Sequence, residues 1–227
     1  MPSKYGNFIY TDEKNTVESD LKLICYYSTP IYKKGFKRNL LPNAIDPHLC
    51  THLNIGIVDI ANCTLQISDV LIETFKQTEA LKAKNDKLKI LLWVGGAGEV
   101  SGFSEMVSNH TNRKKFIQSL KATLEEYRLD GIDLDWEFPN GFSKERMHFS
   151  QLLHEIRREY QREHRTYLLS LAVAAPAVFV DMSYDVPQIN DNVDYINIMT
   201  YDYHFYSKET PYTGKQIEII ELNKNYK

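Results

Sequence analysis

The sequence from Asp130 to Pro139 reads Asp-Gly-Ile-Asp-Leu-Asp-Trp-Glu-Phe-Pro, and it decides the fold class. Side chains alternate along a β-strand, so Asp133, Asp135 and Glu137 share one face while the residues between them give an apolar opposite face. In an open sheet covered by helices on both sides, each buried carboxylate would cost roughly several kcal/mol. In a (β/α)8 barrel one face points to the axis, whose C-terminal mouth holds polar chemistry. The stretch therefore favours an α/β fold of the TIM-barrel type.

The rest of the chain alternates between strand-like and helix-like segments. Six apolar runs predict strands: Leu21–Tyr27, Thr51–Val58, Lys89–Val94, Gly131–Glu137, Tyr167–Ala174 and Tyr195–Thr200. Apolar residues at helical spacing predict helices over 113–128, with Asn112 as N-cap, and over 143–164. Strand, helix, strand units of this kind form right-handed crossovers in a parallel sheet.

The length of 227 residues sets the domain organisation. A complete (β/α)8 barrel takes about 250 residues, and here the sixth strand is followed by 27 residues, counted from Thr200 to Lys227. We expect residues 1–20 to be a polar N-terminal tail and 21–227 to be an incomplete barrel, truncated after about six strands. Two open sheet edges, at strands one and six, would then favour aggregation.

Charge and hydropathy argue against two classes of partner. The 27 basic and 30 acidic residues give a net charge of -3, without the basic surplus that nucleic-acid binding needs. The longest apolar run, Leu168 to Val180, is interrupted by Ser170 and Pro176 and is shorter than the roughly 20 residues of a membrane helix. We therefore expect no nucleic-acid partner and no membrane partner.

Three carboxylates on one strand face have a chemical meaning of their own. Close carboxylates cannot all ionise at neutral pH, so one member, most usefully the outermost Glu137, stays protonated as an acid. Two alternatives remain open: a solvated edge strand, or a site for Mg²⁺ or Ca²⁺, although carboxylates about 7 Å apart on a straight strand are too linear to surround an ion. A glycosidase also needs a second carboxylate opposite the acid, whereas here the neighbours lie below it.

The stretch resembles the DGxDxDWEYP signature of the family 18 chitinases and chitinase-like lectins. Other segments are similar to the same family over roughly residues 21 to 214: Cys25–Tyr27, Ile45–His52, Leu91–Gly96, Met106–Asn109 with Asn112–Arg113, and Met199–His204. The resemblance implies a retaining, substrate-assisted chitinase without a cofactor or metal, acting as a monomer on chitin or N-acetylglucosamine oligosaccharides.

The resemblance also implies roles for individual residues. Glu137 would protonate the glycosidic oxygen and later deprotonate water, Asp135 would orient the acetamido N–H of the substrate, and Asp133 would share a proton with Asp135. Tyr201 would hydrogen-bond the acetamido oxygen. The substrate-binding residues implied are Tyr26, Gly95, Gly96, Trp136, Met199, Asp202 and Tyr203. For Tyr26, core packing is an equally good interpretation.

Cysteine usage and the resemblance point to different compartments. An odd number of cysteines and the absence of a signal segment in residues 1–20 would fit reduced thiols in the cytosol. The resemblance instead implies a Cys25–Cys50 disulfide and an extracellular protein, and leaves Cys63 unexplained. Sequons at Asn62 and Asn109 would matter only after secretion. The spacing of His48, Cys50 and His52 lacks the motifs that accompany zinc sites, so we expect no metal there.

The sequence departs from the family at positions that contact sugars. Pro30, Ile57 and Ala97 stand where the family commonly has aromatic residues, and Phe205 where it usually has glycine. Loss of flat aromatic faces predicts weaker binding of long chitin chains. Two alternatives to a chitinase therefore stay open: a chitin-binding lectin-like protein without turnover, and an inactive fragment.

Overall fold

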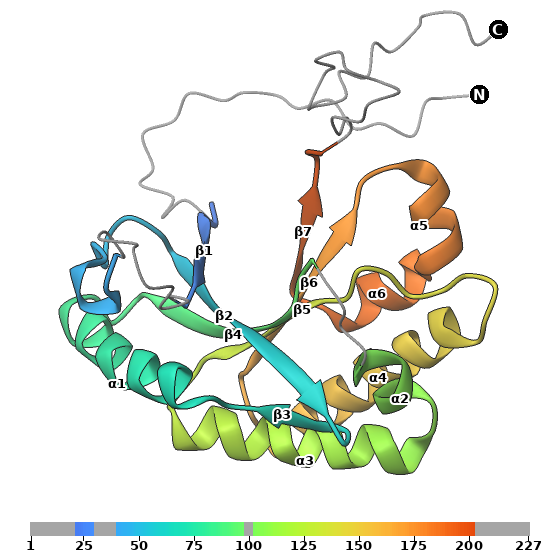
Figure 1. Cartoon of the computed structure of the whole chain (residues 1–227), viewed down its shortest axis with the longest axis horizontal. Helices are drawn as coiled ribbons and strands as arrows, with labels where there is room; N and C mark the ends of the chain where they lie inside the picture. Colours follow the sequence, from blue (N-terminus) through green and yellow to red (C-terminus); the bar gives the residue numbers. More distant parts are fainter. Residues whose placement is uncertain (1–20, 30–39, 98–101, 203–227) are drawn as a thin grey trace, which may run out of the picture.

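The computed structural model describes residues 21–29, 40–97 and 102–202. Its main sheet has six parallel strands in the order of the chain (Figure 1): β1 (Ile24–Ser28), β2 (His52–Ala61), β4 (Lys89–Gly95), β5 (Gly131–Asp135), β6 (Leu168–Ala174) and β7 (Tyr195–Met199). A short strand, β3 (Thr64–Gln66), pairs antiparallel with the end of β2. The six predicted strands are confirmed, each within a few residues of its predicted bounds.

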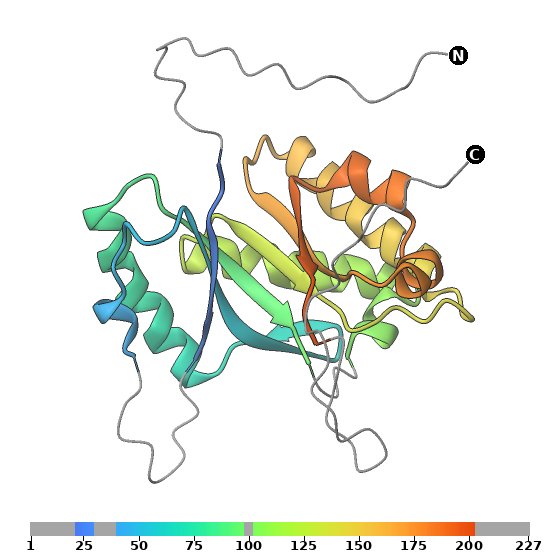
Figure 2. The same ribbon diagram turned by 90° about the horizontal axis from the view of Figure 1, so that it is seen from above.

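Helices cover the outer face of this curved sheet, and β1 and β7 stand at the two ends of its concave side (Figures 1 and 2). The helical elements are η1 (Pro42–Ala44, a 3₁₀ turn), α1 (Asp69–Lys84), α2 (Gly102–Val107), α3 (His110–Glu126), α4 (Glu145–Arg162), α5 (Ala177–Ser183) and α6 (Val186–Asn192). Each parallel strand pairs with the next one along the chain, as in a (β/α)8 barrel. The fold is a half-barrel of the predicted class.

Alternation along β5 sets the two sides of the sheet. Ile132 and Leu134 are fully buried in the hydrophobic core between sheet and helices. Asp133 is equally buried and Asp135 is 4% exposed, but both point the other way, toward side chains of β1, β4, β6 and β7. The prediction that the acidic face of this strand lies on the barrel axis is confirmed.

Asp130, the first residue of the deciding stretch, fixes the start of β5. Its Oδ2 accepts a hydrogen bond from the Ile90 backbone N–H at 2.8 Å. The same oxygen forms an ion pair with Lys82 Nζ at 2.7 Å. Lys82 is on α1, and Ile90 is on β4. One carboxylate therefore connects the strand to its neighbouring strand and to a covering helix.

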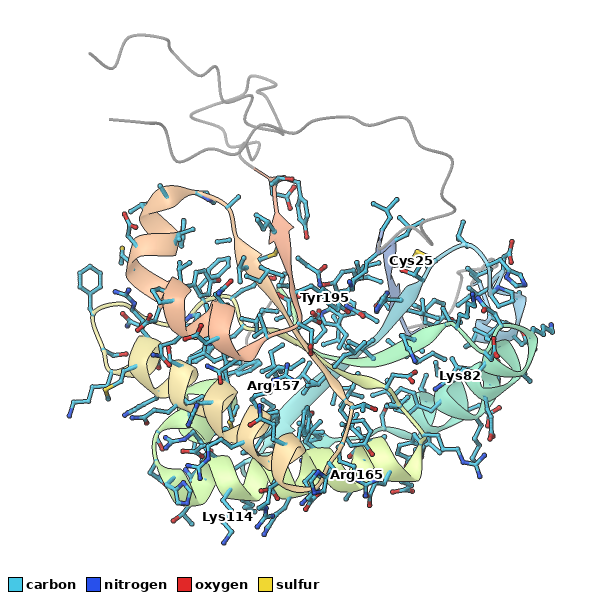
Figure 3. The ribbon with its side chains drawn as sticks, turned by 180° about the vertical axis from the view of Figure 1, so that it is seen from behind. Cys25, Lys82, Lys114, Arg157, Arg165 and Tyr195 are labelled. Atoms are coloured by element: carbon cyan, nitrogen blue, oxygen red, sulfur yellow. A yellow bond between two sulfur atoms is a disulfide. The ribbon has the colours of Figure 1, made fainter. Side chains whose placement is uncertain are left out.

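A second connection of this kind joins α4 to β7. Arg157 donates hydrogen bonds to the Asn192 carbonyl and to the Asp194 carboxylate, just before Tyr195 (Figure 3).

One local prediction needs correction, and one strand was not predicted. The N-cap of α3 is Asn109, whose Oδ1 accepts the Asn112 backbone N–H at 3.0 Å, so the helix begins three residues earlier than Arg113. Asn112 lies inside the first turn instead. The strand β3 was not predicted, because three residues are too few to show an alternating pattern. It follows a tight turn in which Asn62 and Cys63 have φ of 51° and 57°, as in a type I′ hairpin.

A disulfide joins Cys25 of β1 to Cys50, two residues before β2 (Figure 3). The pairing implied by the family resemblance is confirmed. Cys50 is therefore no thiolate, and the zinc interpretation of His48, Cys50 and His52 loses its sulfur ligand. Cys63 is a free thiol, 4% exposed, in the hydrophobic core. Within the described ranges, no helix combines the length and apolar character that crossing a membrane requires.

Candidate active site

A cleft of about 530 Å³ lies on the concave side of the sheet. Its lining comes from β1, β4, β5, β6, β7 and the residues just after β7: Ile24, Tyr26, Trp93, Asp135, Ala172, Ile196, Asn197, Ile198, Met199 and Tyr201. A larger surface groove of about 820 Å³ runs along α4, and Arg113, Gln151 and Gln188 are among its lining residues. We take the smaller cleft as the candidate site, because Asp135 of the acidic face of β5 lines it.

Asp133 lies at the bottom of this site and is fully buried. Its Oδ1 accepts hydrogen bonds from Ser170 Oγ at 2.6 Å and Asn197 Nδ2 at 3.1 Å, and its Oδ2 accepts from Tyr26 Oη at 2.8 Å. Burial raises the pKa of Asp133, and the hydrogen bonds from Ser170, Tyr26 and Asn197 act in the opposite direction. Strands β1, β6 and β7 thus converge on one carboxyl group.

Asp135 lies one step further toward the C-terminal end of β5. Its Oδ2 accepts a hydrogen bond from the indole Nε1 of Trp93 at 2.9 Å, while its buried Oδ1 has no hydrogen-bond partner among the described residues. Burial raises the pKa of Asp135 to about 6; the Trp93 hydrogen bond lowers it, and the charges of Glu137 and Asp133 add to the rise. The site therefore contains a carboxyl group with a pKa of about 6, and one of its two oxygens has no hydrogen-bond partner among the described residues.

Glu137 follows the end of β5 and is partly exposed. Burial raises the pKa of its carboxyl group, and the charge of Asp202 raises it further. The direction agrees with the prediction of a protonated outer acid. The predicted cause is corrected. Partial burial and the charge of Asp202 raise the pKa of Glu137, whereas the two acids beneath it were expected to do so.

Several other predicted site residues lie in or near the cleft. Tyr26, Met199 and Tyr201 line the cleft, and Asp202 acts electrostatically on Glu137. The Tyr201 side chain is 57% exposed; burial of its remainder raises the pKa of its hydroxyl, as do the nearby acidic charges. Tyr203 lies outside the described residues.

Gly95 is the last residue of β4 and Gly96 follows it; their φ angles of 100° and 105° lie in the region that favours glycine. A Cβ on Gly95 would lie 2.1 Å from the Asp135 carbonyl oxygen, and the Gly96 N–H donates to that same oxygen at 2.8 Å. The two glycines thus allow the end of β4 to approach the backbone of Asp135 closely. The predicted contact of Gly95 and Gly96 with substrate stays a prediction.

Trp136 was predicted to bind substrate, and here the structure corrects the prediction. Its side chain is 5% exposed, stacked on Phe103 with ring centroids 5.2 Å apart and packed edge-on against Phe149. Strand alternation is the physical reason, because Trp136 belongs to the apolar face opposite the acids. The residue contributes to the core beneath α2 and α4.

Among the cleft residues that sequence reasoning missed, Trp93 and Asn197 matter most for the chemistry. Both contact an acidic residue directly, through the 2.9 Å and 3.1 Å hydrogen bonds described above. A signal for Trp93 was present in the sequence, because it alternates with Gly95 along a predicted strand and so shares that residue's face. In the sheet, Trp93 stands in register with Asp133.

A model of the glycosyl hydrolases family 18 matches residues 22–226 of this chain. The chain belongs to family 18. Similar proteins include mouse chitotriosidase-1, which is 34% identical over 82% of this chain. Among solved structures, the Group IV chitinase of Ostrinia furnacalis superposes with a TM-score of 0.73 at 37% identity over 82% of this chain. Human YKL-39, described as a pseudo-chitinase with retained chitooligosaccharide binding, gives a TM-score of 0.73 at 34% identity over 81% of this chain.

The matched region is only part of these relatives. This family 18 chain spans 42% of the length of the mouse protein and 52% of each of the two solved chains, or about half of a relative. The shared half contains the strand with the acidic residues. The similar structures include both a chitinase and a pseudo-chitinase. Family membership therefore does not by itself establish catalytic turnover.

Proposed function

We propose that this chain is a chitinase-type hydrolase that cleaves β-1,4-linked N-acetylglucosamine polymers with retention of configuration. The observation that carries the proposal is the arrangement of Asp133, Asp135 and Glu137, which run from the buried axis of the half-barrel, through Asp135 in the lining of the cleft, to the partly exposed Glu137. A protonated outer acid above an unpaired carboxylate oxygen suits acid catalysis next to a developing positive charge.

The mechanism assigns the first step to Glu137. Its raised pKa favours the protonated form that can donate to the glycosidic oxygen. The other acids of β5, Asp135 and Asp133, lie beneath Glu137, so in this mechanism the nucleophile is the acetamido carbonyl oxygen of the substrate, an arrangement known for this class of glycosidase. Attack of that oxygen on the anomeric carbon breaks the glycosidic bond and forms an oxazolinium ion. Glu137, now ionised, then takes a proton from the water that opens this ion from the same face.

Asp135 stabilises the cation formed in between. Its buried Oδ1, which has no hydrogen-bond partner among the described residues, would accept the acetamido N–H of the substrate. With its pKa raised to about 6, this carboxyl group is ionised at neutral pH and can be neutral in mild acid. Asp133, held by three hydrogen bonds, provides a fixed acidic partner one layer below with which a proton can be shared. Tyr201, on the rim of the cleft, would donate to the acetamido oxygen.

A second candidate function is chitooligosaccharide binding without turnover. The specific observation in its favour is that two exposed positions lack an aromatic side chain: Ile57 of β2 is 40% exposed, and Ala97, two residues after β4, is exposed. Aliphatic side chains there give sugar rings less stacking surface, so long chains would be held weakly. The human pseudo-chitinase shows that binding can persist in a relative of this fold.

An extracellular site of action fits the proposed substrate. The Cys25–Cys50 disulfide is of the kind that persists in oxidising compartments. Both sequon asparagines, Asn62 and Asn109, are exposed and would be accessible to glycosylation. From the family resemblance we also propose that the protein binds the oligosaccharide as a monomer.

The deciding experiment compares wild-type protein with its Glu137→Gln variant on a fluorogenic chitotrioside. We expect measurable turnover by wild type and a loss of at least about 100-fold in Glu137→Gln, because the general acid is removed. Circular dichroism and thermal unfolding of both proteins verify the fold, and isothermal titration with chitotriose measures binding. Binding by both folded proteins with no turnover by either would select the second candidate. Folded proteins that neither cleave nor bind would refute both.

A further inference from the structure

We propose that Trp93 is a positioning residue: its indole N–H holds one oxygen of Asp135, so that the other oxygen faces a ligand in the cleft. This inference deepens the proposed function and rests on it for its catalytic consequence. Nothing in the family resemblance assigned a role to Trp93. The evidence is the packing around the indole and the unequal bonding of the two Asp135 oxygens.

The Trp93 side chain is fixed from several directions. Gly56 of β2 leaves room for it, since a Cβ there would lie 2.5 Å from the Trp93 carbonyl oxygen and 3.0 Å from its Cβ. The ring of Tyr26 packs edge-on at a centroid distance of 5.0 Å, and Gly96 leaves space beside the far end of the indole. An indole held in this way can present its N–H in only one direction, and that direction is Asp135.

The two oxygens of Asp135 consequently differ. Oδ2 accepts the Trp93 N–H at 2.9 Å, while Oδ1 is buried and without a hydrogen-bond partner among the described residues. An unpaired buried acceptor is costly unless a ligand donor satisfies it. The arrangement suits an incoming amide N–H, which the 2-acetamido group of N-acetylglucosamine supplies. Without the indole N–H, the carboxyl group would lose its fixed orientation.

The hydrogen bond also favours the ionised form of Asp135. Its charged and titratable neighbours come from several elements: Asp133 on β5, Glu137 after it, Tyr26 on β1, Tyr184 after α5 and Tyr201 after β7. A Trp93→Phe substitution keeps an aromatic ring and leaves all of these groups in place. A change in Asp135 titration caused by that substitution therefore reports the N–H group.

The first test needs no substrate. The chain has two tryptophans, and Trp136 is buried on the opposite face of the sheet. We expect the tryptophan emission of the full-length wild-type chain to show a pH transition near 6 that is absent from both Trp93→Phe and Asp135→Asn. A transition that persists in Asp135→Asn, or no transition in wild type, would overturn the inference. Thermal unfolding of each variant verifies that the comparison is between folded proteins.

The second test measures the catalytic consequence on the chitotrioside. We expect Trp93→Phe to lower kcat about 10- to 100-fold with KM changed less than about twofold, and to move the acid limb of kcat/KM to higher pH. A residue that only filled space would leave the pH profile in place, and an unchanged profile with unchanged kcat contradicts the proposal. If wild type shows no turnover, the proposed hydrolase function fails, while the loss of the emission transition in Asp135→Asn still decides whether Asp135 titrates in contact with the Trp93 indole.

Discussion

Asp135 carries a charge that opposes folding at neutral pH. Burial raises its pKa from the ordinary 3.8 to about 6. Below about pH 4 the group is protonated in both the folded and unfolded chain. Between about pH 4 and 6 the folded chain holds a proton that the unfolded chain has released, so this group's contribution to stability is lost as the pH rises through 6. A rise of about two pKa units corresponds to at most about 3 kcal/mol.

Asp135→Asn removes that charge, so we expect the variant to be more stable than wild type at pH 7.5 by about 1 to 3 kcal/mol and equal to it at pH 4. Urea unfolding at the two pH values measures the difference. Asp59→Asn, at an exposed carboxylate on β2, is the matched control and should show no such pH-dependent gain. An Asp135→Asn difference of the same size at both pH values would mean that packing, not charge, is responsible.

Site residues could be predicted where they follow from the alternation of side chains along one strand. Site residues whose role depends on contacts between strands were missed. Alternation placed Asp133 and Asp135 on the axis, and the same rule should have moved Trp136 to the core, where it lies. The importance of Trp93 depends on the register of β4 with β5, which no pattern within a single strand contains. The effect of Asp202 on Glu137 likewise joins the ends of two strands 65 positions apart in the sequence.

At the scale of elements, the strands were easier to predict than the helix ends. A helix boundary depends on which of several nearby polar residues supplies the cap, and around α3 the candidates Asn109 and Asn112 are only three positions apart. Apolar spacing over 113–128 identified the helix and its buried face correctly, since Phe116, Leu120 and Leu124 are fully buried. It carried no information about the first turn, whose residues are polar and mostly exposed.

The cap itself is testable. We expect Asn109→Ala to lower stability by about 1 kcal/mol, or the melting temperature by about 2 to 4 °C, because the Asn112 N–H loses its acceptor. Gln118→Ala, on the exposed face of the same helix, is the control and should change stability by less than about 0.5 kcal/mol. Differential scanning calorimetry at one pH compares the two. Equal losses in both variants would show that Asn109 does not act as the cap.

At the scale of the whole molecule, two strands of the six-stranded parallel sheet have one partner each in the described part of the chain. β1 pairs only with β2, and β7 pairs only with β6. Ile196 and Ile198 of β7 are 40% and 57% exposed, and Leu23, just before β1, is 54% exposed. An unpaired strand with exposed apolar side chains is a template for association with other apolar surfaces.

We therefore expect the isolated chain to bind an apolar fluorescent dye and to self-associate with rising concentration, and Ile198→Lys to reduce both. Lysine adds a charge to the β7 edge, and the exposed position means that little core packing is lost. Val178→Lys, at a 61% exposed site on α5, has similar exposure but lies away from the edge, so it should leave dye binding and association unchanged. Dye titration and sedimentation velocity measure the two effects. Equal reductions in both variants would assign the association to net charge, and a wild-type chain that stays monomeric without binding dye would show that the β7 edge is not an accessible apolar surface.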